Sequence, residues 1–70
     1  MQEKYLNTLR KKKIVCRFFT TNGFQMQGVV VSFDSFAIVI EDETHHQNMI
    51  YKHAISTISP AERVDLTEEA

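Results

Sequence analysis

Short strand-forming segments separated by turn signals fill most of this chain and constrain its fold more than any other feature. From Ile14 onward, runs rich in β-branched and aromatic residues occupy positions 14–20, 24–31, 36–40, 48–51 and 54–58. Consecutive strands of this length curl into small, partly open barrels. We therefore predict a mainly β fold with a strongly bent, five-stranded antiparallel sheet within residues 14–59.

Glycine and turn-forming residues mark where this sheet should reverse or bend. Asn22-Gly23 is a strong hairpin signal, because both residues tolerate the positive φ of a type I′ turn. Gly28 lies inside the second segment, where glycine often marks a bend or a close backbone approach. Residues 32–35 predict a turn, and the continuously apolar third segment predicts a strand buried on both faces.

A short amphipathic helix should precede the sheet. Tyr5, Leu6 and Leu9 form a narrow apolar stripe of helical period within residues 2–12. The basic run 10–13 falls at its end, where cations suit the helix dipole. About ten residues are too few for an independent helix, so it must pack on the sheet.

Lys52 and His53 lie side by side between strand-forming segments. In a continuous strand, neighbouring side chains point to opposite faces, so one of the two would enter the core. A tight break between two short strands avoids this and predicts that both side chains stand at a loop tip.

The chain is short enough to need stabilisation from outside its own core. With 70 residues and one cysteine it has no internal disulfide, and its Cys and His spacing resembles no zinc site. The short fourth and fifth strands should lie at sheet edges, and unpaired edges can pair with another copy. A closed ring of copies would supply the missing stability.

The lone cysteine and the distribution of charge indicate the compartment and the domain organisation of this protein. A lone thiol at Cys16, the lack of a signal peptide and the lack of a long apolar run predict a cytoplasmic protein with no membrane span. Residues 1–60 carry seven cations and five acids, whereas residues 61–70 carry one cation and four acids. We predict one domain over 1–60 and a disordered acidic tail over 61–70.

Four stretches of the chain form a distinctive combination of motifs. They are Tyr5-Leu6-Asn7-Thr8-Leu9-Arg10, Asn22-Gly23-Phe24-Gln25-Met26-Gln27-Gly28, Ser32-Phe33-Asp34-Ser35-Phe36 and Tyr51-Lys52-His53-Ala54-Ile55-Ser56-Thr57. Together they resemble the Hfq family, the bacterial Sm-like RNA-binding proteins. The resemblance covers about residues 2–60. It implies the Sm-like fold, a homohexameric ring, and an RNA chaperone that pairs small regulatory RNAs with messenger RNAs without catalysis, cofactor or metal.

The resemblance further implies two RNA-binding faces and a basic rim. U-rich single strands are expected to meet Gln2, Ser35, Phe36, Lys52 and His53 around the pore, with Phe36 as the stacking ring. A-rich strands are expected on the opposite face, at Phe19, Gly23, Phe24, Gln25, Met26, Gln27, Asn48 and Thr57. Either Gln47 or Asn48 could be the amide that reaches a base there. The rim positions are Arg10, Lys11, Lys13 and Phe33, where cations would bind phosphates without reading sequence.

Other interpretations of the same residues remain. Segment 41–46 is about two residues longer than in well-known relatives, and its His45-His46 pair would need further ligands to hold a metal. Asp34, His53 and Ser56 are the residue types of a hydrolytic triad, but no nucleophile motif accompanies them. The alternative from another class is a ring-forming structural or protein-interaction module with weak RNA binding.

Overall fold

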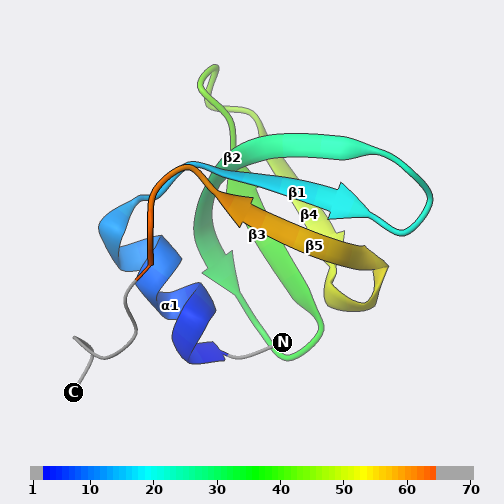
Figure 1. Ribbon diagram of the computed structural model, residues 1–70, viewed down its shortest axis with the longest axis horizontal. Helices are drawn as coiled ribbons and strands as arrows, with labels where there is room; N and C mark the ends of the chain where they lie inside the picture. The colour runs from blue at the N-terminus through cyan, green and yellow to red at the C-terminus, as the bar shows by residue number, and fades with distance from the viewer. Residues whose placement is uncertain (1–2, 65–70) are drawn as a thin grey trace.

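One helix and five antiparallel strands make up the computed structural model, which describes residues 3–64 (Figure 1). The elements are α1 (Glu3–Lys12), β1 (Cys16–Thr20), β2 (Gln25–Phe33), β3 (Ala37–Glu41), β4 (Gln47–Tyr51), the 3₁₀ turn η1 (Lys52–Ala54) and β5 (Ile55–Pro60). The sheet order is β4-β3-β2-β1-β5, which confirms the predicted fold and leaves β4 and β5 at its two edges.

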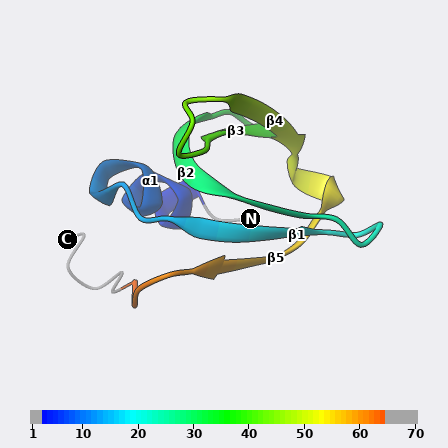
Figure 2. The ribbon, with the colours of Figure 1, turned by 90° about the horizontal axis from the view of Figure 1, so that it is seen from above.

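The sheet bends along β2, which belongs to both halves of the fold (Figure 2). At Gly28 the backbones of β2 and β3 approach closely, because a Cβ there would lie 2.6 Å from the Glu41 carbonyl oxygen. The pairing of β2 with β3 also shifts register between Val30 and Ser32, and such bulges increase bending. The close approach predicted for Gly28 is confirmed.

The β1–β2 hairpin forms where Asn22-Gly23 predicted it, but with a different turn. Gly23 has φ +94°, whereas Asn22 does not have a positive φ, so the type I′ prediction is wrong. Instead, the Thr20 Oγ1 hydroxyl stabilises the loop by accepting a hydrogen bond from the Phe24 amide at 2.9 Å. A longer, side-chain-stabilised loop therefore needs only one residue with positive φ.

Helix α1 buries the predicted stripe and ends in a Schellman motif. Leu6 and Leu9 are fully buried, and Thr8 is buried with its hydroxyl bonded to the Lys4 carbonyl. At the end of the helix, the Ile14 amide donates to the Leu9 carbonyl at 3.2 Å. The Lys13 amide donates to the Arg10 carbonyl, and Lys13 adopts φ +52°.

The core lies between α1 and the concave side of the sheet. Its buried members are Leu6, Leu9, Ile14, Cys16, Phe18, Val30, Ile38, Ile40, Ile50 and Ile55. Burial raises the pKa of the Cys16 thiol to about 11. Among residues 3–64, no helix is both long and apolar enough to cross a membrane.

The boundary predicted at residue 60 is not a sharp structural limit. The Ala61 amide donates to the Val15 carbonyl at 2.8 Å, and Val64 packs against the core. The predicted tail continues into 65–70, which lie outside the described residues, as does Gln2.

Candidate nucleic-acid interface

An exposed aromatic residue and two ionisable residues lie together where β3 begins and β4 ends. Phe36 lies in the β2–β3 turn with 76% of its surface exposed. The Lys52 amide donates to the Phe36 carbonyl at 2.7 Å, which joins this turn to η1 and brings Lys52 and His53 beside it. The predicted break at 52–53 is confirmed as a 3₁₀ turn. The prediction that Phe36 begins a buried strand is wrong, because β3 begins at Ala37.

Asp34 holds the Phe36 turn in shape. Its Oδ1 accepts hydrogen bonds from the backbone amides of Phe36 and Ala37, both at 2.8 Å. These two bonds lower the pKa of the Asp34 carboxyl, with a smaller contribution from the charge of Lys52. The carboxylate thus fixes the backbone from which Phe36 projects, while neighbouring Ser35 is exposed.

Two further aromatic residues lie against the ionisable pair. The Lys52 ammonium stands 5.7 Å from the centre of the Phe33 ring, and the Tyr51 and His53 rings stack with centroids 5.8 Å apart. Phe33 was expected in the 32–35 turn. It is instead the last residue of β2, and its ring lies beside the Lys52 ammonium.

A row of predicted residues crosses the outer surface of three strands. Gln25 pairs with Phe19 on β1, and Phe19 pairs with Thr57 on β5. Paired residues point to the same face, so an aromatic ring is flanked by an amide and a hydroxyl. Gln27 lies two residues along β2 on the same face.

The other residues predicted for this surface are more scattered. Phe24 is 65% exposed and follows Gly23 at the hairpin tip. Met26 pairs with Phe18 and packs against the core, so it lies on the opposite face from Gln25. The alternation Gln25-Met26-Gln27 is the sequence signal that could have predicted this.

Asn48 lies on β4, at the far edge of the sheet from Thr57. It pairs with Ile40, whereas the neighbouring Gln47 amide donates to the Glu41 carboxylate at 3.3 Å. The Gln47 amide is thus already engaged within its own loop.

Two polar residues on the outer surface, Arg17 and Ser59, were not predicted from the sequence. Arg17 pairs with Gln27 on one side and with Ser59 on the other, and all three are exposed. Counting back two residues from Phe19 along β1 would have placed Arg17 on this face. Its guanidinium adds a positive charge to a face whose predicted residues are all uncharged.

The basic rim gathers at the end of α1. Arg10, Lys11 and Lys13 are exposed there, and the Arg10 guanidinium donates to the Asn7 side chain at 2.7 Å. Arg10 and Lys13 line a shallow depression over β2, which Glu41 borders. The positive patch therefore has a carboxylate at its margin.

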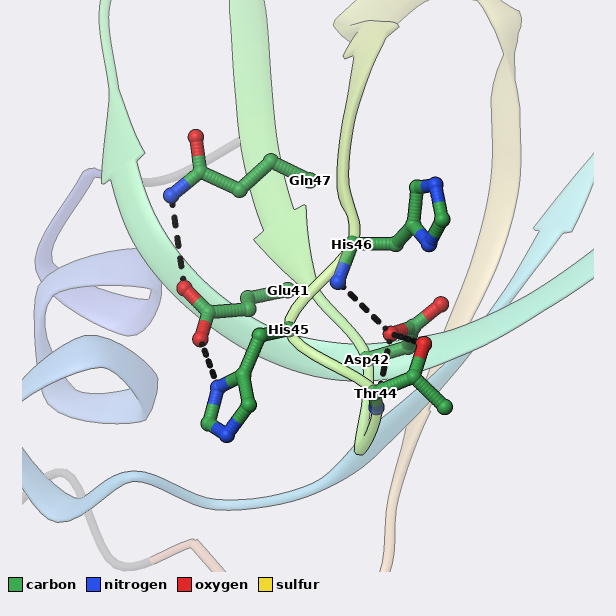
Figure 3. A network of polar contacts seen from close by, with 6 residues as sticks. All are labelled: Glu41, Asp42, Thr44, His45, His46 and Gln47. Atoms are coloured by element: carbon green, nitrogen blue, oxygen red, sulfur yellow. Dashed lines mark hydrogen bonds and ion pairs between the residues drawn. The ribbon is translucent and has the colours of Figure 1, made fainter.

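The β3–β4 loop is an ordered acidic turn (Figure 3). Asp42 Oδ1 accepts bonds from the Thr44 amide, the Thr44 hydroxyl and the His46 amide. The His45 ring contacts Glu41 Oε2 at 2.9 Å, and this contact is the main cause of the lowered pKa of Glu41. Figure 1 shows the loop at the opposite end of β3 from the Phe36 turn.

Neither a metal site nor a catalytic triad forms in the described part of the chain. Within residues 3–64, no three His, Cys, Asp or Glu side chains are placed to share a metal ion. Asp34 is bonded to its own turn, and the Ser56 hydroxyl donates to the Phe19 carbonyl at 3.2 Å. Both side chains therefore bond backbone groups, and neither of these bonds joins the His53 ring as a hydrolytic triad would require.

A terminal helix on a strongly bent, five-stranded sheet, with aromatic and ionisable side chains at its turns, defines a small Sm-like domain. The family model described as "Hfq protein" matches residues 1–65. The chain belongs to the Hfq family.

Relatives and a solved structure agree with this assignment. The chain is 52% identical over 71 residues to "RNA-binding protein Hfq" of Fervidobacterium nodosum, covering 99% of this chain and 80% of the relative. It is 45% identical over 69 residues to the protein of that name from Clostridioides difficile, with the same coverage. A crystal structure of "the pleiotropic translational regulator, Hfq" superposes with a TM-score of 0.78 at 36% identity, covering 84% of this chain and 88% of that one.

Proposed function

We propose that this protein is an RNA chaperone that acts as a homohexameric ring in the cytoplasm. It binds single-stranded RNA and promotes pairing of small regulatory RNAs with messenger RNAs, without catalysis or cofactor. Family membership and the RNA-binding names of the relatives support this function. The observation that carries it is the junction between Phe36 and Lys52.

The U-rich site is proposed at this junction. Phe36 is exposed for stacking, and a base on an aromatic ring gains about 1–3 kcal/mol. Lys52 offers donors to a base edge or phosphate, and His53 lies next to it. A ring would repeat this pocket around its pore, which favours short U-rich runs.

The A-rich site is proposed on the outer surface of β2, β1 and β5. Phe19 and Phe24 supply rings for stacking, and Gln25 and Gln27 supply amides that can pair with an adenine edge. In the proposed ring, β4 of one copy pairs with β5 of the next. Asn48 of one subunit would then approach Thr57 of its neighbour, which explains why one chain alone keeps them at opposite edges.

The basic rim is proposed to assist annealing. Arg10, Lys11 and Lys13 can attract two RNA strands through their phosphates without reading sequence. Binding at such contacts releases counterions, so affinity should fall steeply with salt.

Filter binding with labelled U-rich and A-rich oligonucleotides tests the two faces. Phe36→Ala should weaken U-rich binding and spare A-rich binding, whereas Phe24→Ala should do the reverse. Each loss should correspond to about 1–3 kcal/mol for every base stacked. Native mass measurement of each variant shows whether the ring persists.

Two results would contradict the proposal. Failure of the unmodified ring to bind either oligonucleotide at moderate salt would leave the ring-forming structural or interaction module as the function. Equal loss of both oligonucleotides in Phe36→Ala, with an intact ring, would show that the two sites are not on separate faces.

A further inference from the structure

Phe33 connects the protein core with the ammonium group of Lys52. The ring is half-buried and packs against the core cluster. The Lys52 ammonium lies 5.7 Å from the ring centre, within the range of a cation–π contact. Because Phe33 is the last residue of β2, the ring is held by both the sheet and the core.

Lys52 needs such support more than most cationic side chains. A lysine ammonium sits on a flexible four-carbon stem and samples many rotamers when nothing restrains it. The backbone of Lys52 is anchored by its 2.7 Å bond to the Phe36 carbonyl, but that bond leaves the side chain free. The Phe33 ring supplies the missing restraint at the end of the stem.

The position of the ring also sets where the charge stands. The Phe33 ring directly precedes the turn that carries Phe36, and the Lys52 amide bonds the Phe36 carbonyl, so the ammonium over the ring stays near this turn. A base stacked on Phe36 would then have the donor group of Lys52 beside it. Without the ring, the ammonium could swing into solvent at little cost.

We propose that Phe33 is a positioning residue of the U-rich site, acting through Lys52. This inference rests on the proposed function, because it assumes that the Phe36–Lys52 junction binds RNA. It assigns Phe33 to the same pocket as Phe36, in addition to the rim position that the resemblance implies.

A double-mutant cycle on the intact ring tests the proposal. Phe33→Leu keeps an apolar side chain but removes the ring face, Phe33→Tyr keeps the ring, and Lys52→Ala removes the ammonium. The affinities for U-rich and A-rich oligonucleotides are measured for each single variant and for Phe33→Leu combined with Lys52→Ala. Native mass and thermal midpoint identify variants with a damaged fold, and Phe33→Met replaces Phe33→Leu if leucine loosens the core.

The proposal predicts a specific pattern of affinities. Phe33→Leu should weaken U-rich binding about two- to fivefold for each pocket, as expected for loss of a cation–π contact, and leave A-rich binding unchanged. Phe33→Tyr should restore wild-type binding. In the Lys52→Ala background, Phe33→Leu should have no further effect, because the group that Phe33 positions is gone.

Two contrary outcomes are distinguishable. If Phe33→Leu weakens binding by the same factor with and without Lys52, or weakens both oligonucleotides equally, the positioning role is wrong while the proposed function stands. If the unmodified ring does not bind the U-rich oligonucleotide, the U-rich site itself is wrong and the positioning role falls with it.

Discussion

The carbonyl oxygen of Glu41 occupies the space that a side chain at position 28 would need. A Cβ built on Gly28 would lie 2.6 Å from that oxygen and 3.0 Å from the carbonyl carbon. Both atoms belong to the backbone of β3, so neither can rotate away as a side chain would. The bend of the sheet therefore depends on the absence of a side chain at this position.

Replacing Gly28 with alanine should destabilise the fold. Forcing an extra carbon into a closely packed site typically costs about 1–3 kcal/mol, and here the β2–β3 backbone must move to accept it. Urea unfolding of Gly28→Ala and of Ser32→Ala, an exposed position on the same strand, measures the effect. Equal stabilities of the two variants would contradict a close approach at Gly28.

Replacing Lys13 with glycine should stabilise the monomer fold and weaken the rim. Lys13 adopts φ +52° at the end of α1, a conformation that costs a non-glycine residue roughly 1 kcal/mol. Lys13→Gly should raise the free energy of unfolding by about that amount, whereas Lys12→Gly, at the last residue of the helix, should lower it. Sequence-independent RNA affinity at low salt should fall in Lys13→Gly, since a rim cation is lost.

Removing the Asp34 charge should change how stability depends on pH. The pKa of Asp34 is below its usual value of 3.8, because the carboxylate accepts the Phe36 and Ala37 amides. A group with a lowered pKa stabilises the fold above its unfolded pKa, and this contribution is lost as pH falls through the folded pKa. The pKa values of Glu41 and Asp42 are lowered too, so they act in the same direction.

Denaturant unfolding of Asp34→Asn across pH provides the measurement. The variant should be less stable than wild type near neutral pH. The difference should begin to shrink near about pH 4, the usual pKa of an unfolded aspartate, and should vanish as pH falls through the lower pKa of the folded Asp34 carboxyl. A difference that stays constant down to acid pH would mean that the charge of Asp34 does not support the turn.

Cys16 should be unreactive in the folded protein. The thiol is 1% exposed, and burial raises its pKa to about 11. At about pH 8 only about one thiol in a thousand would be ionised, and the thiolate is the reactive form. Iodoacetamide should label Cys16 in denaturant but not in buffer, with free glutathione as the reference for full reactivity. Rapid labelling in buffer would show that the β1 core opens readily.

Local sequence patterns predicted the elements well, but not all of their ends. The helix, the five strands, the hairpin position and the break at Lys52-His53 follow from apolar periodicity and turn chemistry, which act over a few residues. The end of β2 and the start of β3 were each misplaced, because strand pairing extends β2 through Phe33 and leaves Phe36 in the turn. Hydrophobicity alone cannot distinguish an aromatic residue in a strand from one displayed beside it.

The candidate sites divide in the same way. Alternation along β1 and β2 places Phe19, Gln25 and Gln27 on one face, and it should also have revealed Arg17 there. The contact between Phe33 and Lys52 has no such signal, because the two residues are far apart in the chain and belong to different elements. Likewise, the sequence gives the acidic composition of the loop 41–46 but does not predict the ordered turn around Asp42.

By itself, the amino-acid order determined that this chain forms a helix followed by five short strands with exposed edges, and that Lys52 and His53 stand at a turn. Only the tertiary structure decided that this turn meets Phe36, that the Lys52 ammonium stands over the Phe33 ring, and that Glu41 excludes a side chain at Gly28. The physical reason is range. Propensity, period and turn chemistry act between near neighbours in the chain, whereas these contacts depend on strand register and on the bend of the whole sheet.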